Sequence, residues 1–203
     1  MKQLFIALTL LGASFIYSNT EDKHTTRNLE YQWVELGMWN REYVVAICGD
    51  FHNVPYLEQK ITATIHAIGE TLQRFYSKKV AHDFTQLIQK QQLLTYDLLA
   101  AITKKNEEAV TKKTEALKEL SMKMSTFLAK LNPYLAAALT RDLFINSQGA
   151  LLAMAKERCE KKWKEELQAY DEYRDKTHQF GILFSEALEN SFPKKSKPVV
   201  TVE

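Results

Sequence analysis

Charged and aromatic residues interrupt apolar stretches of the chain at three places. They are Trp33, Trp39, Arg41, Tyr96, Asp97, Tyr170 and Asp171. Burying a charge is costly unless an opposite charge lies beside it, so we expect Arg41 to pair with Asp97 or Asp171 inside the fold. Two interpretations stay open: an internal salt bridge that fixes helix register, or a small-molecule pocket with aromatic walls and one or two charged anchors.

The common catalytic motifs are missing from this sequence. It contains no HExxH motif, no Gly-rich phosphate loop, no GxSxG elbow and no dinucleotide fingerprint. We also find no activated nucleophile, and no paired general acid and base at a recognisable spacing. We therefore predict no catalytic residue and no cofactor, which favours a non-enzymatic protein.

A metal or redox site is the first alternative. Di-metal helical bundles use Glu-x-x-His pairs on facing helices. Asp175 and His178 form a variant of this pair, and Asp97 is a further candidate ligand. Glu21 and His24 have the exact spacing, but they lie near the start of the chain. Under this alternative, His178 and Asp175 would hold the metal.

The first 18 residues have the pattern of an export signal. Lys2 is followed by an apolar run over 4–17, with small residues near its end and charged residues soon after it. The run is shorter than the roughly 20 apolar residues of a membrane span. We predict cleavage near Ser18 or near Ser14, giving a soluble periplasmic or secreted bacterial protein. The alternative is an uncleaved membrane anchor.

The predicted export affects how the two cysteines are interpreted. Cys48 and Cys159 are an even pair, and an oxidising compartment permits a disulfide between them. The alternative is two buried thiols that act as small hydrophobic side chains. The sequence has no CxxC motif, so a thioredoxin-like redox role has no support.

Helical periodicity dominates the rest of the chain and predicts an all-α fold, an antiparallel up-and-down bundle of four to five main helices. The sequence has only 6 Gly and 4 Pro, which favours long helices with few joints. The first four predicted helices span 28–48, 56–76, 80–102 and 107–131.

The C-terminal part is predicted as a short helix over 134–144, a turn over 146–149 and a last helix over 150–190. A straight helix of that last length would extend about 60 Å, too long for one packed face in a small bundle. We therefore expect a bend or break near Gly181.

The predicted organisation is a signal peptide over 1–18, a flexible segment over 19–27, one helical domain over 28–192 and a disordered basic tail over 193–203. The 27 Lys and Arg residues nearly balance the 25 Asp and Glu residues, so no overall field attracts nucleic acid. No segment after residue 18 is apolar enough to span a membrane. The expected partner is an unidentified small molecule or protein, and the oligomeric state is left open.

A resemblance to a known family rests on residues spread over the chain. They are Trp33-x5-Trp39-x-Arg41, Phe75-Tyr76, Phe84, Leu87-Ile88, Asp97, Phe127-Leu128, Asn132-Pro133-Tyr134, Tyr170-Asp171 and Ser191-Phe192-Pro193. Over roughly residues 30–193, this order resembles a bacterial helical-bundle family of uncharacterised function, common in spore-forming bacteria. The resemblance implies the helical fold and a polar core built on Arg41, Asp97 and Asp171, but no reaction.

The family pattern also includes three histidines. The matching positions hold Leu36, Gln91 and Ser147 in this chain. The resemblance therefore implies that a histidine-based metal site, if the family has one, is lost here.

Three functional classes follow, in order of preference. The first is an exported, non-enzymatic bundle that binds a small ligand or a protein. The second is the metal or redox protein described above. The third is a structural or host-facing secreted protein, whose basic tail at 194–197 or charged fourth helix meets a membrane or partner.

Overall fold

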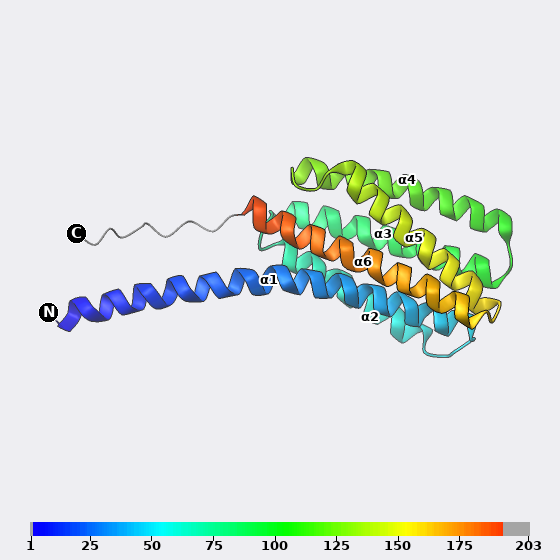
Figure 1. Cartoon of the computed structure of the whole chain (residues 1–203), viewed down its shortest axis with the longest axis horizontal. Coiled ribbons are helices and arrows are strands. Elements are labelled where there is room, and N and C mark those ends of the chain that lie inside the picture. Colours follow the sequence, from blue (N-terminus) through cyan, green and yellow to red (C-terminus); the bar gives the residue numbers. More distant parts are fainter. Residues whose placement is uncertain (1, 193–203) are drawn as a thin grey trace.

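Residues 2–192 fold into six α-helices that form a bundle (Figure 1). The computed structural model describes the backbone of residues 2–192 and the side chains of residues 25–192. The helices are α1 (Lys2–Cys48), α2 (Val54–Leu72), α3 (Lys78–Thr103), α4 (Glu107–Leu131), α5 (Ala137–Cys159) and α6 (Trp163–Ser191). No strand occurs between residues 2 and 192. The all-α prediction is confirmed, although six helices replace the expected four to five.

Neighbours in sequence are also neighbours in space, and α6 returns to pack against α1. The two helices run in opposite directions. Thr26 Oγ1 near the middle of α1 donates to Glu189 Oε1 at the end of α6, whereas Arg41 reaches Glu166 at the start of α6. In Figure 1 the blue N-terminal part of α1 extends beyond the other helices. Among residues 25–192, no helix has the length and apolar character that crossing a membrane requires.

Helix starts follow the capping residues of the sequence. Ser77 Oγ accepts a hydrogen bond from the backbone N–H of Val80 and caps α3. Asn106 Oδ1 accepts from the backbone N–H of Ala109 and caps α4 in the same way. Pro55 lies in the first turn of α2, where its missing N–H has no helical partner to lose.

Three helices end in the same backbone motif without a glycine. Asp50, Lys105 and Lys161 follow the ends of α1, α3 and α5 with φ values of 55°, 54° and 60°. After each of them, the next backbone N–H bonds to a carbonyl five residues earlier. These bonds join Phe51 to Ala46, Asn106 to Ala101 and Lys162 to Glu157, over 2.9, 3.0 and 2.9 Å. This left-handed closure satisfies carbonyls that a helix end leaves open.

The turn predicted over 146–149 is wrong, because these residues lie inside α5. Gln148 is buried and accepts a hydrogen bond from Ser121 of α4. Gly149 is exposed, and a Cβ there would meet nothing within 4 Å. Packing of the polar residues against α4 and α6 thus outweighs the low helix propensity of Asn, Ser and Gly. The predicted start at Tyr134 is also wrong, since α5 begins at Ala137.

The break expected near Gly181 lies instead at residues 160–162, between α5 and α6. Gly181 is buried inside α6. A Cβ at this position would stand 3.2 Å from the carbonyl oxygen of Glu30, so glycine here allows α6 to approach the α1 backbone closely. The long apolar pattern over 150–190 therefore belongs to two helices.

Aromatic side chains fill the centre of the bundle. Phe84 and Phe184 are fully buried and meet edge to face, with ring centroids 5.7 Å apart. The ring centroid of Phe180 lies 4.7 Å from that of Trp33 and 4.6 Å from that of Phe144. Each ring of this size contributes about 1.5–3 kcal/mol through burial, so this cluster holds α1, α3, α5 and α6 together.

The predicted boundaries are partly outside the described residues. The segment 19–27 was expected to be flexible, but Thr25 and Thr26 are buried in α1. The Thr25 hydroxyl accepts a hydrogen bond from Arg74, which follows α2. The predicted basic tail over 193–203 lies outside the described residues.

Candidate functional site

The predicted pairing of Arg41 with Asp97 or Asp171 is wrong. Both carboxylates are exposed, with 56% and 62% of their side chains accessible. Asp97 forms a salt bridge with Lys113 of α4, and Asp171 pairs with Arg174 one turn along α6. In a helix, a residue next to a buried leucine in sequence can point toward solvent. The leucines around Asp97 therefore did not imply that Asp97 is buried.

Arg41 pairs with a different acid, Glu166 in the first turn of α6. The Arg41 Nη2 atom lies 3.6 Å from Glu166 Oε1, and Arg158 Nη1 lies 3.8 Å from Glu166 Oε2. The Glu166 side chain is 2% exposed. The Arg41 guanidinium also stacks over Tyr170, with its carbon 4.7 Å from the ring centroid. A buried carboxylate thus faces two arginines.

Cys48 and Cys159 form a disulfide with an S–S distance of 2.04 Å. The sequence allowed either a disulfide or two buried thiols, and the structure contains the disulfide. It joins the last residue of α1 to the last residue of α5, at the same end of the bundle as Glu166. We call Arg41, Cys48, Arg158, Cys159 and Glu166 the disulfide-end cluster.

Trp39 and Tyr96 lie in surroundings of their own. Trp39 Nε1 donates to Glu35 Oε1 over 3.1 Å, and Lys60 lies over the indole ring. The Tyr96 ring packs on Tyr43, with centroids 4.5 Å apart. Burial raises the pKa of the Tyr96 phenol far above its usual value, so the group stays neutral. Neither residue belongs to the pocket described next.

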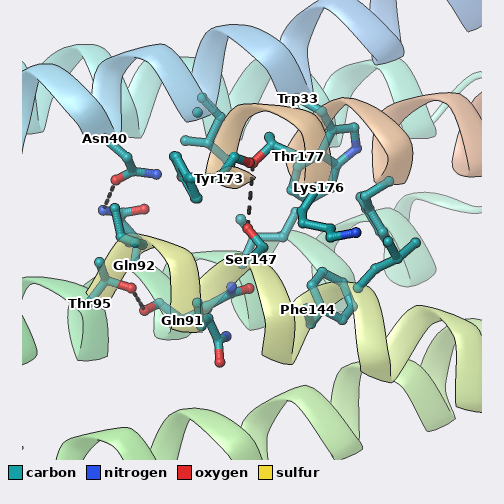
Figure 2. Close-up of a pocket in the computed structure, with 17 residues that line it drawn as sticks. Trp33, Asn40, Gln91, Gln92, Thr95, Phe144, Ser147, Tyr173, Lys176 and Thr177 are labelled. Carbon is teal, nitrogen blue, oxygen red and sulfur yellow. Dashed lines mark hydrogen bonds between the residues drawn. The ribbon is translucent and has the colours of Figure 1, made fainter. Parts of the chain in front are cut away.

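Trp33 is the one predicted site residue that lines the central pocket, which lies between α1, α3, α5 and α6 (Figure 2). The cavity measures about 60 Å³. Its walls combine apolar side chains, uncharged polar side chains and one lysine. The 17 lining residues are Trp33, Leu36, Gly37, Asn40, Ile88, Gln91, Gln92, Thr95, Leu143, Phe144, Ser147, Gln148, Leu151, Tyr173, Lys176, Thr177 and Phe180.

Some polar groups of the central pocket bond to one another. Gln92 Nε2 of α3 donates to Asn40 Oδ1 of α1 over 2.7 Å. The hydroxyls of Ser147 and Thr177 face each other across α5 and α6 at 3.5 Å (Figure 2). These bonds use acceptors of the wall, and they fix the side chains that shape the cavity.

Two donors of the central pocket have no acceptor in the described part of the chain. They are the Trp33 indole N–H and the Gln148 side-chain amide nitrogen. Trp33 is 5% exposed and Gln148 is 9% exposed. A buried donor without a partner costs about 1–3 kcal/mol, and native proteins leave few of them. Two such donors in one cavity wall therefore mark the central pocket as a candidate binding site.

Three half-buried residues lie at the edge of the central pocket, and the other lining residues are buried. These three are Gln91, Ser147 and Lys176. Lys176 is the one charged residue of the lining. It makes no salt bridge with any residue of the described chain, and its amine donates to Gln179 at 3.4 Å. In Figure 2, Lys176 and the Trp33 indole nitrogen lie at the same end of the pocket.

Tyr173 is the one titratable residue of the lining besides Lys176. Burial raises the pKa of its phenol to about 12, while hydrogen bonds with Asn40 and Thr177 partly oppose this rise. The hydroxyl is therefore neutral at ordinary pH. The phenol does not ionise near neutral pH, so Tyr173 acts only as a polar part of the wall.

Sequence reasoning missed the uncharged polar residues of the central pocket. Gln92 and Thr95 stand in the buried row of α3 between Ile88 and Leu99. Thr177 similarly stands in the buried row of α6. A neutral polar residue at a core position of a helix is a weak but usable signal of a lined cavity, and attention to charged residues passed over it.

The metal alternative finds no support in the placement of its candidate residues. His178 Nε2 lies 2.9 Å from Glu30 Oε1 of α1, Asp175 pairs with Arg174, and Asp97 lies on α3 beside Lys113. Among the described residues, no group of three His, Cys, Asp or Glu side chains is arranged to hold a metal ion.

Family models, curated proteins and solved structures give no match to this chain. Leu36, Gln91 and Ser147, the residues at which the sequence analysis expected family histidines, all line the central pocket. Residues from α1, α3 and α5 that a sequence pattern singled out thus meet at one cavity.

Proposed function

We propose that this protein is a non-enzymatic small-molecule-binding bundle, and that the central pocket is its binding site. The observation that carries the proposal is the pair of buried donors, Trp33 Nε1 and Gln148 Nε2, which lack acceptors in the described chain. A ligand with acceptor atoms in the cavity would offset their burial.

The shape of the central pocket supports this proposal. Residues on four helices converge on one cavity whose walls are mostly buried and whose edge is polar. Ligand sites in helical bundles are built in this way, from side chains of facing helices. Leu36, Gln91 and Ser147, from three different helices, also meet here.

We also propose that the protein is exported and that residues 1–18 are its signal peptide. The Cys48–Cys159 disulfide supports export, because such bonds persist in oxidising compartments. The intact mass of the protein recovered after expression with its own N-terminus tests this. Loss of an N-terminal segment together with two hydrogens is expected; an uncut, fully reduced chain would overturn it.

The binding proposal is tested with a panel of small neutral, anionic and cationic molecules. Binding is followed by NMR, from the indole N–H resonance of Trp33, which the Trp33→Phe variant identifies. We expect at least one class of molecule to shift this resonance and to raise the thermal unfolding midpoint. If no class does so in the folded protein, the central pocket holds only water and the proposal is wrong.

A matched pair of variants locates the binding. Ser147→Leu places an apolar side chain at the edge of the central pocket, whereas Asn146→Leu makes the same kind of change on the exposed side of α5. Ser147→Leu should abolish the resonance shift, and Asn146→Leu should keep it. A shift that survives Ser147→Leu would place the ligand elsewhere.

A further inference from the structure

We infer that the ligand of the central pocket is a small organic anion, with a carboxylate as its chemical class. This inference rests on the proposed function and names the chemistry of the same site. The carboxylate oxygens would accept from Trp33 Nε1 and Gln148 Nε2, and Lys176 would balance the negative charge.

The hydrogen-bonding groups of the central pocket favour an acceptor over a donor. The unpartnered groups are both N–H donors, whereas the Asn40 and Gln148 carbonyl oxygens already accept hydrogen bonds from Gln92 and Ser121. An ammonium or guanidinium ligand would bring further donors to a wall whose two unpartnered buried groups are already donors. A carboxylate brings only acceptors, with up to four lone-pair directions.

The charges around the central pocket favour a negative ligand. Lys176 lines the pocket, and no acidic residue does. Lys176 is half-buried and is not neutralised by a salt bridge within the described residues. Hydrogen bonds to a charged acceptor are roughly twice as strong as neutral ones, and the partly apolar surroundings strengthen them further.

The volume limits the size of the enclosed group. Apolar cavities of about 150 Å³ in other proteins hold one benzene molecule, and the central pocket measures about 60 Å³. By the same ratio it accommodates about two to three non-hydrogen atoms below its edge. The carboxylate group of acetate or propionate, with three such atoms, matches this size, and the rest of the acid would extend past Gln91 and Ser147 toward solvent.

The test compares ligands of equal size and different charge. Acetate and propionate are titrated into the full-length protein at constant ionic strength, with acetamide, propionamide and propylamine as the neutral and cationic counterparts. The Trp33 indole resonance reports binding in each case. We expect the carboxylates to bind about tenfold more tightly than the amides, and propylamine not to bind.

Two variants separate the role of Lys176 from the overall charge of the protein. Lys176→Met removes the positive charge at the pocket, and Lys164→Met removes the same charge from an exposed position on α6. Lys176→Met should weaken carboxylate binding about tenfold and leave amide binding within a factor of two. Lys164→Met should change neither.

Each outcome decides between the two levels of the proposal. Amides that bind as tightly as carboxylates, or carboxylate binding that survives Lys176→Met, would overturn the anionic ligand while the binding function stands. If no compound shifts the Trp33 resonance, both fail. Because Lys176 is half-buried, circular dichroism and the unfolding midpoint confirm that its variant remains folded.

Discussion

The disulfide-end cluster and the central pocket are both polar regions enclosed by helices α1, α5 and α6, yet they treat their polar groups differently. At the disulfide end, the buried Glu166 carboxylate has two arginines beside it. In the central pocket, the buried Trp33 and Gln148 donors have no acceptor among the described residues. Arg41 Nε and Glu166 Oε1 also make no hydrogen bond in the described chain, but an opposite charge of the protein itself lies beside each of them. The two donors of the central pocket instead line a cavity that a ligand can enter.

This difference makes separable predictions about stability and binding. Changes in the disulfide-end cluster should lower the free energy of unfolding and leave binding in place, provided the protein stays folded. Changes in the central pocket should remove binding at little cost in stability.

The largest effect is expected from removing the disulfide. The double variant Cys48→Ser, Cys159→Ser releases a covalent loop with a sequence separation of 111 residues. The unfolded chain then gains conformational freedom, and the free energy of unfolding should fall by about 4 kcal/mol. Urea denaturation measures this. A fall below about 1 kcal/mol would show that the bridge contributes little to the folded state.

Removing the buried carboxylate should have the next largest effect. Glu166→Gln keeps the size of the side chain but leaves Arg41 and Arg158 facing each other without an acid between them. We expect a loss of about 2 kcal/mol, smaller than for a fully enclosed pair because both arginines are partly exposed. Glu165→Gln, an exposed neighbour in the same turn, is the control and should lose less than about 0.5 kcal/mol.

Removing one arginine should cost less than removing the acid. In Arg41→Met, the Arg158 side chain still lies near Glu166, and methionine retains part of the packing on Tyr170. The expected loss is about 1 kcal/mol by urea denaturation. A loss as large as that of Glu166→Gln would mean that Arg158 gives the carboxylate no support.

The smallest effect on stability is expected in the central pocket. Trp33→Phe removes an N–H that bonds to no acceptor in the described chain, so no hydrogen bond is lost. The free energy of unfolding should fall by no more than about 1 kcal/mol, from the reduced packing on Phe180. Ligand-induced stabilisation should nevertheless weaken. Full stabilisation by carboxylates in this variant would break the contrast between the two regions.

Most of the fold was predictable because it depends on local signals. The boundaries of α3 and α4 follow from Ser77, Asn106 and the apolar periodicity that each helix presents to the core. The errors at residues 146–149 and at Gly181 share one cause. Both segments contain residues with low helix propensity, and contacts with distant helices stabilise the helix there. A local pattern does not contain those contacts.

The candidate site was predictable only in part. Of the predicted site residues, Trp33 lines the central pocket, and Arg41 lies beside a buried acid that is Glu166 and neither of the two expected aspartates. Glu166 stands in a charged segment of the sequence, beside Glu165 and Lys164, where nothing indicates burial. Which acid lies beside Arg41 depends on the rotation of α6 about its axis relative to α1. Only the packing of the whole bundle determines that rotation.

The position of the disulfide also decides what happens when the chain is cut. Cleavage at the exposed Lys105 would leave two fragments that the Cys48–Cys159 bond still joins. Cleavage at the exposed Lys161 would place both cysteines in one fragment and α6 in the other, held by packing alone. Because α6 carries Lys176 and Thr177, one nick at this loop would leave the helix that completes the central pocket without a covalent link to the rest of the pocket.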